Sequence, residues 1–384
     1  MIAGLLVLAA VVGWGGIASA QAGTKPDAYQ FALIMPMTGG NAGYGMDQVR
    51  SALMGVADIN ANGGVDGVPL KVITEDSQAN PQLGVSAFKK AVSVNKVPIV
   101  VTAWSAVVSA IAPFAAQDHV LTFSIGANNP KIKDLKPWVR TTFPLSDVGI
   151  TALAKYTYTK LDKKTAAIVY VNNDTGVFAA RLYKQIFEAA GGKVVLMEGV
   201  PQDTTNFTSV IAKIMSVHPD VVHMQLLNTG VEQFPGEYRA SGGTALLTSY
   251  EAAQDPVLIK RSPQAANGII FFSTAPDPSL SKPVADFISR WTAKFGRAPN
   301  GPSYCEYLYD APYVIKAVIE YMNAHDMAYT GDNARKAFEA LGSITLPLTG
   351  KMVMQSDGGV VKPVFINEIE NGKFVRIDTV SPGT

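Results

Sequence analysis

Two polar residues, Ser105 and Asn128, each follow a short apolar run with the composition of a buried strand. Ser105 comes after residues 99–102 at the start of a helical pattern, so its hydroxyl and the free N–H groups of a helix N-terminus could hold a carboxylate. The alternative is an N-cap serine that only stabilises the helix. Gly126 and Asn128 follow the next apolar run, residues 120–124. Because neighbouring parallel strands end at one edge of a sheet, we expect both loops to meet a single ligand head group.

Two further side chains could complete such a site. Glu251 follows the apolar run 245–247 and could present a carboxylate to a ligand ammonium, although a lone glutamate is usually an exposed surface residue. Tyr44 lies in the glycine-rich stretch 39–45, which lacks both the spacing of a dinucleotide loop and the lysine of a phosphate loop. We expect the backbone of this stretch to approach a ligand closely at a helix N-terminus, with the Tyr44 side chain over the ligand-binding cleft.

The motifs of common enzyme classes are missing from the sequence. It contains no G-x-S-x-G, H-E-x-x-H or P-loop pattern, and no histidine has a supportable position as a base for Ser105. The four histidines are scattered, and we expect His223, inside an apolar run, to be a satisfied core residue. The single cysteine, Cys305, excludes an intramolecular disulfide and is expected to be a buried thiol. The sequence therefore indicates a binding protein, not an enzyme, with neither metal nor cofactor.

Length and composition indicate a well-buried protein of two lobes. The chain has 384 residues, of which 48% are apolar and 16% charged, and its net charge is +1. Without a basic stripe, nucleic acid is not an expected partner. Residues 1–20 carry no charge and end in A-S-A, which predicts a cleaved signal peptide and export to the periplasm. A signal peptide normally begins with basic residues, and these are missing here. The alternatives are therefore a mis-assigned start codon or an uncleaved membrane anchor.

Short Val/Ile-rich runs alternate with helical patterns from end to end, which is typical of parallel strands buried on both faces by helices. Two such series, with a break near residues 140–144, predict an α/β fold of two doubly wound parallel-sheet lobes. A strand-rich tail, residues 345–380, follows two long helical patterns and suggests a return to the first lobe and one more crossing. Strand ends of both lobes would then line a shared cleft that closes by a hinge.

Residues 58–67, D-I-N-A-N-G-G-V-D-G, form the most specific segment of the chain. They end a helix for which we expect one buried face, made of Val49, Ala52, Leu53, Val56 and Ile59. Gly63 and Gly64 supply the positive φ that a helix end commonly needs. The segment resembles the D-I-N-x-x-G-G-V/I-x-G signature of branched-chain amino acid-binding proteins, the type I periplasmic binding proteins of bacterial ABC importers. The order of Tyr44, this segment, Ser105, R-T-T and Glu251 extends the resemblance over about residues 28–380.

The resemblance implies a type I periplasmic binding protein fold with a three-crossover hinge. Lobe I would comprise residues 28–144 and 275–360, and lobe II residues 145–274 and 361–380. Such a protein captures a branched-chain or other neutral amino acid and delivers it to the transmembrane subunits of an ABC permease; we expect a monomer. By position, Ser105 and the loop from Gly126 to Asn128 would hold the ligand carboxylate and part of its ammonium. Glu251 would pair with the ammonium, and Tyr44 would line the side-chain pocket.

Four positions depart from the family pattern. Thr175 stands where the family has a tyrosine before a glycine, and Asn128 replaces a hydroxyl residue. Trp104 and Ala79 occupy places where some members have a disulfide. Thr175 opens space over the ligand and Trp104 adds a flat surface beside Ser105, so a larger side chain could fit. The alternatives are therefore an aromatic or aliphatic carboxylate without an amine, or a ligand-sensing role beside a signalling protein.

Overall fold

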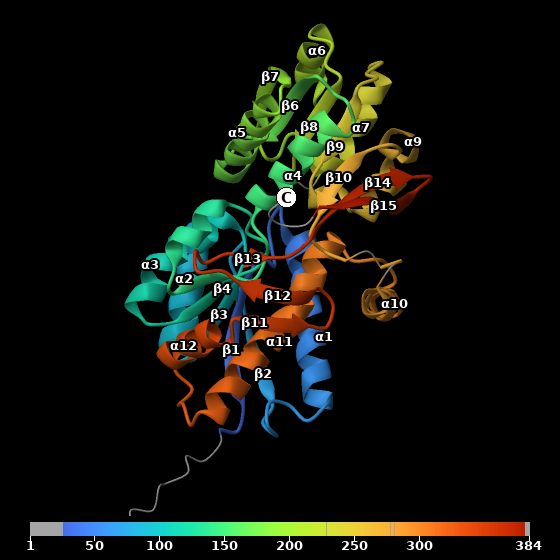
Figure 1. Ribbon diagram of the computed structural model, residues 1–384. Coiled ribbons are helices and arrows are strands. Elements are labelled where there is room, and N and C mark those ends of the chain that lie inside the picture. The colour runs from blue at the N-terminus through green and yellow to red at the C-terminus, as the bar shows by residue number, and fades with distance from the viewer. Residues whose placement is uncertain (1–25, 228, 277, 280, 381–384) are drawn as a thin grey trace, which may run out of the picture.

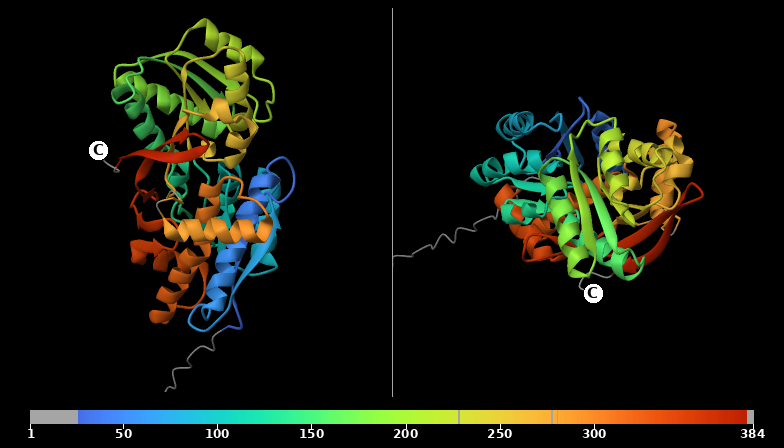
Figure 2. Two further views of the ribbon diagram at one scale, coloured as in Figure 1. Left: turned by 90° about the vertical axis from the view of Figure 1, so that its right-hand side faces the viewer. Right: turned by 90° about the horizontal axis from the view of Figure 1, so that it is seen from above.

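The computed structural model describes residues 26–227, 229–276, 278–279 and 281–380, and the expected signal peptide lies outside these ranges. Figure 1 shows two lobes, one above the other, each built around its own sheet. The turned view in Figure 2 shows that the molecule is elongated along the line joining the lobes. The predicted α/β class with two largely parallel sheets is confirmed. Within the described ranges, no helix combines the length and hydrophobicity needed to cross a bilayer.

Lobe I is built on a five-stranded parallel sheet of order β2-β1-β3-β4-β5. Its strands are β1 (Tyr29–Met35), β2 (Leu70–Asp76), β3 (Ile99–Thr102), β4 (Leu121–Ser124) and β5 (Val139–Thr141). The helical segments are α1 (Ala42–Ala61), α2 (Pro81–Ser93), α3 (Ser105–Gln117), η1 (Pro130–Leu135), α10 (Lys282–Phe295), α11 (Pro302–Ala324) and α12 (Gly331–Leu341). A small antiparallel sheet adds β11 (Ser343–Leu346), β12 (Gly350–Met354) and β13 (Val360–Val361).

Lobe II is built on a seven-stranded sheet of order β15-β14-β10-β9-β8-β6-β7. Its strands are β6 (Thr165–Val171), β7 (Lys193–Val200), β8 (Val221–Gln225), β9 (Leu246–Ser249), β10 (Ile270–Ser273), β14 (Val364–Glu370) and β15 (Lys373–Val380). The helical segments are α4 (Ser146–Thr159), α5 (Asp174–Ala189), α6 (Thr208–Ser216), α7 (Thr229–Ala240), η2 (Glu251–Ala253), α8 (Pro256–Arg261) and α9 (Pro263–Ala266). Among the described strands of this sheet, the pairs β10–β14 and β14–β15 are antiparallel and the other pairs are parallel.

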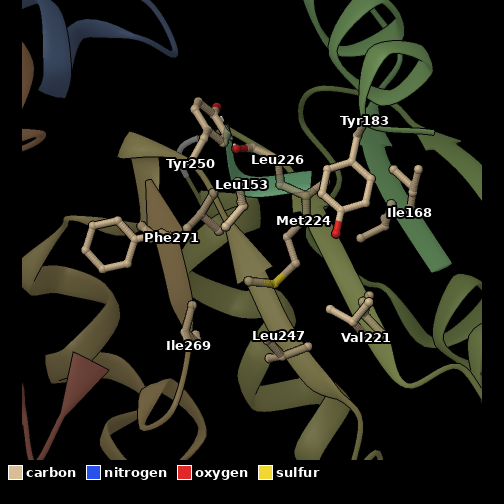
Figure 3. Close-up of a cluster of buried hydrophobic side chains, with 14 of the residues drawn as sticks. Leu153, Ile168, Tyr183, Val221, Met224, Leu226, Leu247, Tyr250, Ile269 and Phe271 are labelled. Carbon is tan, nitrogen blue, oxygen red and sulfur yellow. Dashed lines mark hydrogen bonds between the residues drawn. The ribbon is translucent and has the colours of Figure 1, made fainter. Parts of the chain in front are cut away.

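Strand β1 shows why the sheets read as continuous apolar runs. Phe31, Leu33 and Met35 join the core beneath α1 and α11, whereas Ala32 and Ile34 join the core beneath α2 and α3. Successive strand residues point to opposite faces, so a sheet covered on both sides needs apolar residues at every position. Lobe II repeats this arrangement, and Figure 3 shows apolar side chains from several of its strands packed together.

Helix α1 packs on the sheet through Val49, Ala52, Val56 and Ile59, which are buried as expected. The expectation was wrong for Leu53, which is 43% exposed. Helix α1 also packs against α10 and α11, through Met54 and Gly55, which lie away from Leu53. The buried face is therefore displaced from Leu53. Beyond the helix, Gly63 and Gly64 have φ of +94° and +73°, as the turn requires.

His223 in β8 is a satisfied core histidine, as predicted from its place in an apolar run. Its ring nitrogens lie 3.2 Å from Thr248 Oγ1 and 3.3 Å from Gln225 Oε1, and the ring stacks on Tyr183. Complete burial lowers the pKa of His223 to about 3. Cys305 is likewise buried and free, which confirms the expectation of a core thiol.

The contact between α1 and α11 predicts a strict requirement for glycine. An added Cβ at Gly55 would lie 2.4 Å from the backbone oxygen of Tyr309. Alanine gains roughly 1 kcal/mol in helix propensity, but overpacking against backbone costs about 1–3 kcal/mol. We expect Gly55→Ala to lower the free energy of unfolding, measured by urea titration. Gly40→Ala is the control, because no atom approaches its Cβ position; equal effects of the two substitutions would contradict this account.

The buried imidazole predicts a loss of stability in acid. The pKa of His223 is about 3 when folded and about 6.5 when unfolded, so its contribution is complete above pH 6.5 and falls as the pH decreases. The loss between pH 7 and pH 5 is on the order of 2 kcal/mol. We expect His223→Gln to flatten the dependence of the unfolding free energy on pH. Identical pH profiles of His223→Gln and the wild type would exclude this role.

Candidate functional site

A cavity of about 540 Å³ lies between the lobes and is lined from both sides. Six of the seven predicted site residues line it: Tyr44, Trp104, Ser105, Gly126, Asn128 and Thr175. Glu251 does not, although its neighbours Tyr250 and Ala252 do. Further residues that line the cavity were not predicted from the sequence: Asn41, Gln48, Ser109, Asn129, Asn173, Asp174, Gln202, Gln225, Leu227, Tyr250 and Tyr304.

Ser105 is the first residue of α3, not its N-cap, so the reading as a simple N-cap serine is wrong. The N-cap position is taken by Trp104, and no side chain of the described residues caps the helix. Trp104 has φ +62°, a left-handed conformation that costs about 1–3 kcal/mol in a bulky residue and is often found at ligand sites. The first N–H groups of α3 are therefore left for a ligand at the cavity wall.

The loop after β4 lies beside Ser105, as the parallel pairing predicts. Thr102 of β3 is in register with Ser124 of β4. The backbone N–H of Asn129 donates to Ser105 Oγ over 3.3 Å. Gly126 has φ +81°, and an added Cβ would approach the Tyr304 ring to 3.2 Å. Glycine is therefore required where this loop meets Tyr304.

Asn128 connects this loop to the ring of Tyr304, which enters from α11. Asn128 Nδ2 donates to Tyr304 Oη over 3.3 Å, whereas Asn128 Oδ1 is buried and has no hydrogen-bond partner among the described residues. Tyr304 also stacks on Phe143, in the first connection between the lobes. Tyr304 was not predicted from the sequence as a site residue. The signal that could have found it is a tyrosine in the first turn of a helix that follows a Pro-Asn-Gly-Pro turn.

Glu251 lies in η2, directly after the end of β9, and is only 3% exposed. Burial raises the pKa of its carboxyl group to about 8, although a hydrogen bond with Thr274 acts in the opposite direction. Its Oε2 atom has no hydrogen-bond partner within the described part of the chain. The alternative of an exposed surface glutamate is therefore wrong. A carboxyl group in this setting gains most from a cationic partner.

Thr175 lies in the first turn of α5, on the lobe II wall. Asn173 caps this helix by accepting a hydrogen bond from the Gly176 N–H over 2.9 Å. An added Cβ at Gly176 would lie 2.0 Å from the backbone oxygen of Val171, so glycine is required for the tight turn from β6 into α5. Asp174, between Asn173 and Thr175, is the one acidic residue among the described residues of the lining.

Tyr250 forms another part of the lobe II wall of the cavity. Its Oη atom donates to the backbone oxygen of Leu226 over 2.8 Å, and Figure 3 shows the two residues side by side at the edge of the core. No lysine, arginine or histidine occurs among the described residues that line the cavity. An anionic ligand group would therefore have to be held by backbone N–H and neutral side chains, not by a basic residue.

Known proteins share this architecture. A Leu/Ile/Val/Thr-binding protein of Salmonella typhimurium is 25% identical over 268 residues, which cover 68% of this chain and 73% of the relative. A leucine-binding protein of Thermotoga maritima has a TM-score of 0.81 at 20% identity, covering 92% of this chain and 99% of that one. A solute-binding protein of an ABC transporter from Rhodopseudomonas palustris, solved with 3,4-dihydroxybenzoic acid, has a TM-score of 0.82 at 20% identity, covering 93% and 98%.

The family itself is established by a match along most of the chain. The sequence profile of the periplasmic binding proteins matches residues 28–373. Proteins of this family are receptors and not enzymes, which agrees with the missing catalytic motifs. The resemblance inferred from residues 58–67 is thereby confirmed at the level of the family. The chain belongs to the periplasmic binding protein family.

Proposed function

We propose that this protein is the periplasmic solute receptor of an ABC importer and that its solute is a neutral amino acid. One observation carries the choice of solute. An uncapped helix N-terminus at Ser105 lies beside the Asn128 loop, and acceptor oxygens without donors occur at Asn128 and Glu251. These two kinds of group match the carboxylate and the ammonium of a zwitterion.

The carboxylate would be held at α3. A helix N-terminus favours a negative group by about 0.3–1 kcal/mol when exposed and more when partly buried. Ser105 adds a hydroxyl donor, and its Oγ already accepts the N–H of Asn129, which leaves its proton available. Because the described lining contains no basic side chain, a solute with one carboxylate fits better than one with two.

The ammonium would lie near Asn128 and Glu251. A buried acceptor without a donor costs roughly 1–3 kcal/mol, and an ammonium offers three donors. Both residues lie close to Tyr304: Asn128 hydrogen-bonds to it, and the charge of Glu251 contributes to the raised pKa of Tyr304. Contact between Glu251 and the solute requires its side chain to reach the cavity past Tyr250 or Ala252.

Two relatives support this assignment. The Salmonella protein is described as a Leu/Ile/Val/Thr-binding protein, and the Thermotoga protein as a leucine-binding protein. Two lobes with a cavity between them suit capture by hinge closure. The partner would be the transmembrane subunits of an importer, reached from the periplasm.

Proton release on binding tests the role of Glu251. Its pKa is about 8, so about nine in ten molecules carry a proton on this group at pH 7. An ammonium favours the ionised form. We expect leucine binding to release close to one proton, measured by titration calorimetry in phosphate and in Tris buffer. Glu251→Gln should abolish the release and weaken binding at least tenfold.

The second carboxylate near the cavity provides the control. Asp174→Asn should leave both proton release and affinity close to those of the wild type. If Asp174→Asn removes leucine binding while Glu251→Gln does not, the ammonium lies at the α5 end of the cavity and the proposed orientation is reversed.

An aromatic carboxylate is the second candidate solute. Four aromatic side chains line the cavity, Tyr44, Trp104, Tyr250 and Tyr304, and Trp104 adjoins the proposed carboxylate site. The Rhodopseudomonas protein was solved with an aromatic acid of this kind. If this candidate is correct, benzoate will quench tryptophan fluorescence and raise the melting temperature, whereas leucine will do neither. Trp104→Leu should then remove the quenching; persistent quenching in this variant would exclude Trp104 as the stacking partner.

A further inference from the structure

Several side-chain hydrogen bonds join the lobes, and two of them, beside the cavity, involve consecutive residues of lobe II. Tyr44 Oη, on α1 of lobe I, donates to Asp255 Oδ2 in lobe II over 2.7 Å. Ser303 Oγ, in the first turn of α11, donates to Gln254 Oε1 over 2.9 Å. Gln254 and Asp255 are consecutive and connect η2 to α8. Of these four residues, only Tyr44 lines the cavity.

The Asp255 carboxylate binds elements of both lobes at once. Its Oδ1 atom accepts the N–H of Val257 over 2.8 Å and so caps α8 within lobe II. From lobe I, it accepts a backbone hydrogen bond from Gly301, the N-cap residue of α11. No side chain caps α11 in the manner of an ordinary N-cap within the described residues. Asp255 therefore supplies, from the opposite lobe, the negative group that the N-terminus of this 23-residue helix favours.

The fit around this carboxylate leaves little freedom. Asp255 is 1% exposed. Gly301 has φ +58°, and an added Cβ would lie 3.0 Å from the ring of Tyr44. Glycine thus lets the Tyr44 ring and the α11 N-terminus approach the same carboxylate. Desolvation of a carboxylate is costly, and three donors from two lobes offset that cost only while the lobes are together.

We propose that Asp255 is a positioning residue that holds the lobes closed over the solute, with Tyr44, Gln254 and Ser303 completing an interlobe latch. The inference rests on the proposed receptor function, since only a protein that closes over a solute needs such a device. Any contact made only in the closed arrangement shifts the population toward it and slows solute release. Tyr44 belongs both to the latch and to the cavity wall, so a solute that packs against its ring would support the latch.

The test measures closure without relying on the identity of the solute. Spin labels are placed on introduced cysteines at Gln82 and Asp203, which are exposed, lie in different lobes, and adjoin the cavity region near Ala79 and Gln202. Asp255→Ser keeps an N-cap for α8 but is too short to reach Tyr44. Ser303→Ala removes the second crossing bond without changing a helix cap or the cavity lining. Asp220→Ser is the matched control, because among the described residues the Asp220 carboxylate accepts hydrogen bonds from Lys164 and Thr165 alone, both within lobe II.

We expect Asp255→Ser to shift the inter-label distances of the solute-free protein toward longer values, and Ser303→Ala to do so less. The dissociation rate of leucine should rise about five- to tenfold in Asp255→Ser, with circular dichroism confirming the fold. Asp220→Ser should change neither quantity. Unchanged distances in both latch variants would overturn the latch. If leucine fails to bind the wild type but the distances still shift, the latch stands and the proposed solute is wrong.

Discussion

Parallel pairing of β3 with β4 is the constraint on which the candidate site depends. Because Thr102 and Ser124 are in register, the two strands end together and the residues that follow them share one space. After β3 the chain turns into α3, and after β4 it turns into the Asn128 loop. The backbone N–H of Asn129 in this loop donates a hydrogen bond to Ser105 Oγ. A shift of this register would separate the helix N-terminus from the loop and leave neither able to hold a head group.

The described residues that line the cavity include no basic side chain, so a negative group of the solute must be bound by neutral donors. The lining within the described chain offers helix N-terminal amides, hydroxyls and carboxamides, with Asp174 as its one acidic group. Glu251 lies just outside the lining, and burial raises its pKa to about 8. Such a site weakens binding of a solute with a second negative charge and strengthens binding of a solute with a cation near Glu251. Latch and cavity meet at Tyr44, so binding and closure share one side chain.

Much of this architecture could be predicted from the sequence. Apolar runs identified the central strands of both sheets because strands covered on two faces need apolar residues throughout. The loops after β3 and β4 were placed together by topology alone. The prediction that Leu53 is buried was wrong, because periodicity identifies an apolar stripe on a helix but not which of its residues the neighbouring elements cover. Tyr304 could be recognised from the sequence as a residue near a helix N-terminus but not as the partner of Asn128, and Asp255 could not be found at all. Each reaches its partner from a segment more than a hundred residues away.

The central claim is that an amino acid binds with its carboxylate at α3 and its ammonium toward Asn128 and Glu251. A crystal structure with bound leucine tests this most directly. The account predicts carboxylate oxygens about 2.7–3.2 Å from Ser105 Oγ and an N–H of α3, with the ammonium within the same range of Asn128 or Glu251. A leucine whose ammonium instead contacts Asp174, with its carboxylate away from α3, would contradict it.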